Sequence, residues 1–200
     1  MKRTHRAALR ALAAWLCVFP LSASAHLTSS GMGPIYDGLL HFVLSPEDLV
    51  PVLALAMFVG LRGPAYARRA LLAVPVSWFA GCVLGTSLNF APAWPIAPLS
   101  FVVFGGLVAL DAKVSLRTMT VFACALGLVH GCMNGTGMRW SLSLIGAYAG
   151  LIAGIAVVVA LVSAGVLRLR QPWMRIAVRV AGSWIVASGL LLFGWSLRHA

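Results

Sequence analysis

The sequence predicts an all-α membrane protein, a polytopic bundle of about six transmembrane helices after a cleaved signal peptide. The composition is 61% hydrophobic and only 10% charged, which leaves too little polar surface for a soluble globule of 200 residues. Apolar segments close to the length that crosses a bilayer follow one another along the chain. The net charge of +11 comes from basic clusters between these segments, a pattern that indicates membrane topology rather than nucleic-acid binding.

The N-terminus has the three parts of a secretory signal peptide. A basic region with Lys2, Arg3, Arg6 and Arg10 precedes a short apolar stretch and the small residues Ser22-Ala23-Ser24-Ala25. This predicts a signal peptide at residues 1–25 and one membrane domain at residues 26–200, with His26 as the first mature residue. An uncleaved anchor is the alternative, because apolar stretches of this length overlap with short anchors.

Six apolar segments predict the membrane spans, and the basic residues between them predict their orientation. The segments lie at 47–61, 70–88, 97–112, 118–133, 141–167 and 178–197. The loops at 62–69, 111–117 and 168–179 hold nine lysines and arginines, whereas the opposite side holds only Arg139 and Arg198. The positive-inside rule places those three loops in the cytoplasm and the mature N-terminus in the periplasm, as expected for a bacterial inner-membrane protein.

Small residues indicate how these spans pack. Gly146, Gly150 and Gly154 repeat at four-residue spacing in one segment, and Gly81 and Gly85 do so in another, which favours close contacts between helices. The four cysteines, at positions 17, 82, 124 and 132, include no C-x-x-C pair and indicate no disulfide framework.

Two interpretations account for the acidic residues Glu47 and Asp48 at the start of the first segment. The stretch Ser45-Pro46-Glu47-Asp48 has the pattern of a helix start, with Ser45 as the cap and Asp48 completing a capping box. The second interpretation is a cation site at the outer mouth of the bundle. All four histidines of the mature chain map to that side, as do three of the four acids; the histidines are His26, His41, His130 and His199. Clustered imidazoles and carboxylates are typical ligands of divalent metals.

A second polar segment, LGLVHGCMNGTG at residues 126–137, contains His130 with Cys132 and Asn134 as further donors. A histidine within a span is either a hydrogen-bonded structural residue or a ligand, and both interpretations stay open here. On an unbroken helix, His41 and Asp48 would lie about 10 Å apart, too far to share one ion. A break at Ser45-Pro46 would remove that objection.

These elements resemble the HupE/UreJ membrane proteins over nearly the whole mature chain. The segment GLLHFVLSPEDL stands where that family has a pattern like GLxHPxxGxDHLL, and HG-x-x-x-G stands in the fourth span. By this resemblance His41 matches the first family histidine, Glu47 its aspartate and Asp48 its second histidine. His130 and Asn134 match two histidines of an HGxAHG-like element. Two imidazoles are thus replaced by oxygen donors, which makes the donor set harder.

The resemblance implies a secondary permease for nickel or cobalt, linked to hydrogenase or urease maturation. Its expected metal ligands are His26, His41, Glu47, Asp48, His130 and Asn134, with Asp37 as a supporting oxygen. The metal would be cargo rather than a permanently bound cofactor, and the expected partners are the lipid bilayer, the divalent ion and metalloenzyme maturation proteins. The first alternative is a non-transporting accessory protein. The second is a membrane-embedded metal-dependent hydrolase, against which the sequence has no HExxH motif; it also has no Walker motif.

Overall fold

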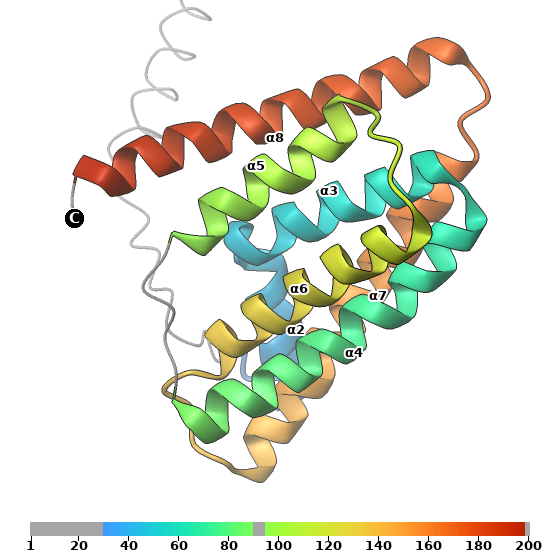
Figure 1. Cartoon of the computed structure of the whole chain (residues 1–200). Helices are drawn as coiled ribbons and strands as arrows, with labels where there is room; N and C mark the ends of the chain where they lie inside the picture. Colours follow the sequence, from blue (N-terminus) through green and yellow to red (C-terminus); the bar gives the residue numbers. More distant parts are fainter. Residues whose placement is uncertain (1–29, 90–94, 199–200) are drawn as a thin grey trace, which may run out of the picture.

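The computed structural model describes residues 30–89 and 95–198, and all regular structure in these residues is helical (Figure 1). The helices are α2 (Pro34–Leu44), α3 (Pro46–Arg62), α4 (Pro64–Leu88), α5 (Ile96–Ala109), α6 (Leu116–Gly135), α7 (Leu142–Leu167) and α8 (Pro172–Arg198). This confirms the predicted all-α membrane bundle. The predicted signal peptide at 1–25 and His26 lie outside the described residues.

Each of the six predicted spans coincides with one helix, from α3 to α8. Four of them, α4, α6, α7 and α8, are long and apolar enough to cross a membrane alone, and the bent pair of α2 and α3 would make a fifth crossing. Helix α5 has 14 residues, about 21 Å of helix against a hydrocarbon core of about 30 Å. The chain is therefore a multi-pass membrane protein, and a count of six crossings stays a prediction.

The first predicted span is preceded by a separate helix, α2, that the apolar pattern did not anticipate. Ser45 has an extended backbone between α2 and α3, and the two helices meet there at a bend of 74°. Helix α2 packs against α7, where the carbonyl of Ile35 faces Gly150 and the carbonyl of Ala147 faces Gly38 so closely that neither glycine has space for a Cβ atom. The glycine repeat of α7 is therefore a contact surface for α2, in agreement with the packing interpretation.

Helix α3 forms the centre of the bundle, between α5 on one side and α7 on the other (Figure 1). Its side chains Val52, Leu55, Phe58 and Val59 are fully buried. Pro51 lies within α3 and the helix continues past it. Because the core-facing side of α3 is covered by other helices, a polar side chain there, such as Asp48, is removed from both lipid and water.

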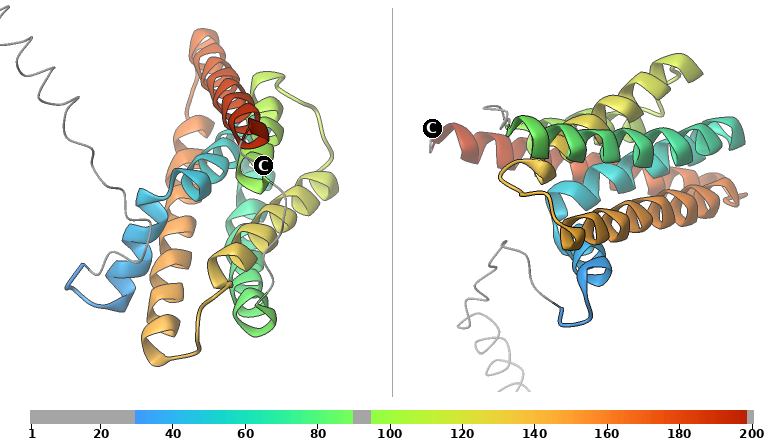
Figure 2. Two further views of the ribbon diagram at one scale, coloured as in Figure 1. Left: turned by 90° about the vertical axis from the view of Figure 1, so that its left-hand side faces the viewer. Right: turned by 90° about the horizontal axis from the view of Figure 1, so that it is seen from below.

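Helices α4 and α6 are held together by interlocking glycines. Gly81 and Gly85 of α4 lie against the backbone of α6, and Gly127, Gly131 and Gly135 of α6 lie against the backbone of α4. Small residues allow such close approach of two helices in a membrane. The two helices lie together toward their ends at Leu88 and Gly135 and diverge toward their starts (Figure 2).

The opposite end of the bundle is tied together by an ion pair. Arg62 at the end of α3 donates to the carboxylate of Asp111, whose other oxygen lies 3.9 Å from Nη2 of Arg175 on α8. Arg175 also donates to the carbonyl of Leu61 at 3.3 Å. Arg62 and Arg175 are two of the basic residues that predict the orientation. They thus also join α8 and the α5–α6 loop to α3.

Candidate functional site

Four helices contribute polar side chains to one buried cluster in the bundle. We call this the polar cluster, and it consists of Asp48 on α3, Trp78 on α4, Ser100 on α5, and His130 and Asn134 on α6. The exposed fraction is 3% for Asp48, 1% for His130 and 8% for Ser100. Ionisable groups are costly inside a membrane protein unless they are paired, so a cluster of this kind marks a candidate functional site.

The carboxylate of Asp48 is the centre of the polar cluster. Its Oδ1 accepts a hydrogen bond from Nδ1 of His130 at 2.9 Å, and its Oδ2 accepts one from Nδ2 of Asn134 at 3.0 Å. Asp48 also lies in the first turn of α3, where unpaired backbone N–H groups give the helix a partial positive charge. Each oxygen of this buried carboxylate is thus paired with a side chain of α6.

The orientation of the Asn134 amide follows from its two partners. Its Nδ2 faces an acceptor, the Asp48 carboxylate, and its Oδ1 faces a donor, Nε1 of Trp78, at 3.1 Å. The reverse orientation would place a donor against the indole N–H and an acceptor against the carboxylate. The Trp78 ring also packs beside the imidazole of His130, with 5.4 Å between ring centroids. Trp78 therefore positions both α6 members of the cluster.

The second ring nitrogen of His130 contacts the hydroxyl of Ser100 on α5. Nε2 of His130 lies 3.2 Å from Oγ of Ser100, and the same hydroxyl lies 2.7 Å from the carbonyl of Ala97. Ser100 has one hydroxyl proton. It can donate to only one of these two atoms at a time, so the orientation of this hydroxyl and the tautomer of His130 depend on each other.

The capping interpretation of Asp48 is wrong. Helix α3 does begin at Pro46 after Ser45, but no side-chain hydrogen bond caps it, and the carboxylate of Asp48 is directed to α6 instead. A charge-assisted hydrogen bond contributes about 1.5–3 kcal/mol, against about 1 kcal/mol for a cap. The contact with His130 therefore outweighs the local one.

The remaining predicted ligands lie apart from the polar cluster. Glu47 is exposed at the start of α3, and His41 is half-buried in the last turn of α2. Asp37 accepts a hydrogen bond from the backbone N–H of Ser30. Within residues 30–89 and 95–198, no three His, Cys, Asp or Glu side chains come close enough to hold a metal ion. The structure thus joins three of the expected ligands, Asp48, His130 and Asn134.

Sequence reasoning missed two members of the cluster, Trp78 and Ser100. Trp78 lies in the middle of a span, whereas tryptophans of the membrane interface lie at span ends. A tryptophan in the middle of a span needs an acceptor for its indole N–H, and its position therefore indicated a polar partner. In the structure Trp78 is fully buried. Ser100 is a single hydroxyl in the apolar segment IAPLSFVVFGGLVA, a weaker signal because serine often bonds to its own helix.

A cleft of about 270 Å³ between α5 and α6 reaches His130 and Ser100. The other residues that line it are apolar, among them Phe104, Phe122 and Leu126. A hydrated cation would lose its water in such a cleft without gaining ligands. The cleft therefore gives lateral access to the cluster for apolar groups and is no route for an ion.

Fold and site together define a polytopic helical membrane protein with a buried imidazole–carboxylate pair beside a helix break. The family of HupE / UreJ proteins matches residues 14–192, and the chain belongs to this family. This membership confirms the resemblance. It implies a nickel- or cobalt-related role in the membrane, either as a permease or as an accessory protein. No curated protein and no solved structure matches the chain.

Proposed function

We propose that this protein is an inner-membrane secondary permease that moves a divalent transition metal, nickel or cobalt, from the periplasm toward the cytoplasm. The observation that supports this best is the buried contact between Asp48 and His130. An ionised carboxylate and an imidazole inside an apolar bundle are expensive to keep, and in membrane proteins such groups belong to ion pathways. A structural contact between α3 and α6 would not need titratable groups.

The break at Ser45 supports the same function. Transporters place their ion sites where a membrane helix is interrupted, because the ends of the two halves offer unpaired backbone groups there. Here the last carbonyls of α2 and the first turn of α3 meet at a 74° bend, three residues before Asp48. Backbone oxygens of α2 would supplement the side-chain oxygens of Asp48 when an ion is bound.

Metal binding at this cluster requires the exchange of internal hydrogen bonds for metal contacts. In the described arrangement the carboxylate of Asp48 accepts hydrogen bonds from His130 and Asn134. A cation that binds His130 takes the lone pair of an unprotonated ring nitrogen, so it must displace the contact of that nitrogen with Ser100 or with Asp48. The exposed Glu47, the half-buried His41 and, at the mature N-terminus, His26 would attract the ion to this site from outside, with Asp37 as a further oxygen.

The driving force would be the membrane potential. An inside-negative potential contributes about 2.3 kcal/mol per elementary charge per 100 mV, which doubles for a divalent ion. Trapping of the metal by maturation proteins in the cytoplasm would add to this gradient.

A second candidate function is a non-transporting accessory protein for metalloenzyme maturation. The hydrogen bonds among the members of the polar cluster favour it, because such bonds also serve to fix α6 on α3. The two candidates differ in whether the protein changes the metal content of the cell.

Metal accumulation in whole cells tests the proposal. Cells that express the full-length protein, its His130→Gln variant or its Cys124→Ala variant are supplied with nickel or cobalt, and their metal content is measured with the amount of folded protein. We expect accumulation with wild type and Cys124→Ala, since Cys124 is on the same helix outside the cluster, and none with His130→Gln. Equal metal content in cells with and without the protein would refute transport and leave the accessory role.

A further inference from the structure

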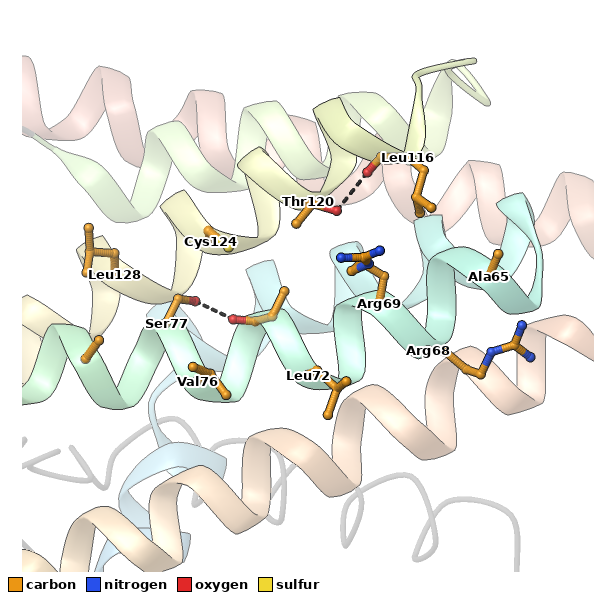
Figure 3. A pocket seen from close by; sticks show the side chains of 12 residues that line it. Ala65, Arg68, Arg69, Leu72, Val76, Ser77, Leu116, Thr120, Cys124 and Leu128 are labelled. Atoms are coloured by element: carbon orange, nitrogen blue, oxygen red, sulfur yellow. Dashed lines mark hydrogen bonds between the residues drawn. The ribbon is translucent and has the colours of Figure 1, made fainter.

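Two hollows of the described surface lie away from the polar cluster, between the diverging ends of α4 and α6. Two adjoining grooves of about 730 Å³ and 820 Å³ run along these helices. They share five lining residues, and Figure 3 labels these in a close view of the first groove: Arg69, Leu116, Thr120, Cys124 and Leu128. Four of the five form a stripe at four-residue spacing on α6, so this stripe separates the grooves, and both grooves reach Arg69.

The interior of the grooves offers nothing to a polar ligand. Ser77 donates its hydroxyl to the carbonyl of Ala73 at 2.7 Å, and Thr120 donates to the carbonyl of Leu116 at 2.8 Å (Figure 3). Both hydroxyls are therefore used within their own helices. The rest of the surface is formed by aliphatic side chains such as Leu72, Val76 and Leu128, which suit a hydrocarbon chain.

One end of the grooves is strongly basic, and no ion pair joins its arginines to an acidic side chain among residues 30–89 and 95–198. Arg68 and Arg69 line the first groove at the start of α4, and Arg69 and Arg117 line the second at the start of α6. All three arginines are exposed. The acidic side chain at this end of the bundle, Asp111, pairs with Arg62 and lies near Arg175. The starts of two helices add partial positive charge at the same place.

The size of the grooves matches a lipid of one leaflet. The first groove extends from Ala65 to Ala80 on α4, about 22 Å of helix, and both extend from Leu116 to Leu128 on α6, about 18 Å. Half of a hydrocarbon core is about 15 Å. Two apolar grooves of this length that meet at one arginine correspond to two acyl chains joined at one phosphate.

We propose that this surface binds a diacyl phospholipid with an anionic headgroup. Arg69, with Arg68 and Arg117, holds the phosphate, and one acyl chain lies in each groove on either side of the α6 stripe. Basic pockets between transmembrane helices on the cytoplasmic side are typical sites for anionic lipids. The lipid would fill the space between α4 and α6 where they lack glycine contacts, and so fix the angle at which α6 presents His130.

Lipid titration of the purified full-length protein, followed by native mass spectrometry, tests this site. The delipidated protein is titrated with palmitoyl-oleoyl phosphatidylglycerol or with the corresponding phosphatidylcholine. We expect tighter binding of the phosphatidylglycerol. Arg69→Gln should weaken it about fivefold, the effect of one basic residue near anionic lipid, and Arg117→Gln should act in the same direction. Cys124→Trp, which fills the stripe shared by both grooves, should weaken binding of both lipids.

Arg170→Gln is the matched control, because Arg170 is exposed in the α7–α8 loop outside the grooves. Equal affinity for the two lipids would overturn the proposal. An equal loss in Arg170→Gln and Arg69→Gln would overturn it too, since that marks diffuse attraction to a basic surface. Displacement of the lipid by inorganic phosphate alone would refute the role of the grooves. A change from dimer to monomer in Cys124→Trp without loss of lipid would assign the surface to a second copy.

Discussion

Nδ1 of His130 lies 2.9 Å from the carboxylate of Asp48, although 82 positions separate the two residues in the chain. This contact joins α3 to α6 in the interior of the bundle, directly after the bend at Ser45. It makes Asp48 differ from its neighbour Glu47, which is exposed. Two adjacent carboxylates thus have different environments, and this difference gives a direct test of the site.

Asp48→Asn is expected to abolish metal uptake, whereas Glu47→Gln is expected to raise the half-saturating metal concentration by no more than about fivefold. The first change removes the buried charge that would hold the ion. The second removes an exposed charge, whose contribution is at most about 1 kcal/mol because water screens it. Uptake over a range of nickel and cobalt concentrations, normalised to folded protein, measures both. Normal uptake in Asp48→Asn would exclude the carboxylate from the transport site.

The double variant Asp48→Asn with His130→Gln is expected to be more stable than the sum of its single variants predicts. Each single variant leaves a buried partner without its counterpart, at a cost of about 1–3 kcal/mol. The double variant removes both, so the coupling free energy should lie within about 0.5–3 kcal/mol. Thermal or denaturant unfolding in detergent measures it. His41→Gln combined with His130→Gln is the control pair and should be additive within about 0.5 kcal/mol; additivity in both pairs would mean that Asp48 and His130 do not interact.

The helices were largely predictable from the sequence because each apolar segment carries its own signal. The six segments lie at α3 to α8, the start of α3 at Pro46 follows from its proline and serine, and the glycine repeats do mark contacts. Helix α2 was not predictable. Its angle depends on the docking of Gly38 against the backbone of α7, a contact between parts of the chain about a hundred residues apart.

The polar cluster was predictable only in part, for a related reason. Periodicity indicates which residues face the interior of a bundle, but it does not indicate which helix they face. The capping pattern at Ser45 and Asp48 is satisfied in the sequence, yet the fold offers Asp48 a stronger partner in His130. Trp78 and Ser100 have common structural uses in membrane helices, so only the arrangement of four helices assigns them to this site.

Reporter fusions are expected to place residues near Pro64 and Lys113 in the cytoplasm and Ala200 in the periplasm. The basic bias predicts this orientation, and the ion pair between Arg62 and Asp111 brings the ends of α3 and α5 to the same side of the bundle. A reporter at Lys113 tests whether the short helix α5 crosses the membrane. If α5 does not cross, Lys113 becomes periplasmic and Ala200 cytoplasmic, which would contradict both the count of six spans and the proposed topology.

Gly150→Ala and Gly165→Ala, two changes on the same helix, are expected to have opposite effects on stability. A Cβ atom at Gly165 meets nothing within 4 Å, so alanine should stabilise α7 there by about 0.5–1 kcal/mol. A Cβ atom at Gly150 would collide with the carbonyl oxygen of Ile35, so alanine there should cost about 1–3 kcal/mol as α2 is displaced.

The same pair of variants links the docking of α2 to the site. Displacement of α2 changes the bend at Ser45 and with it the position of Asp48, so Gly150→Ala should lower metal uptake per folded molecule, and Gly165→Ala should not. Gly38→Ala, which meets the backbone of Ala147 from the other side of the contact, should reproduce the defect. Unfolding temperatures in detergent and uptake in cells provide the two measurements. If Gly150→Ala is as stable and as active as Gly165→Ala, then α2 does not depend on its contact with α7, and the bend at Ser45 must be held by α3 alone.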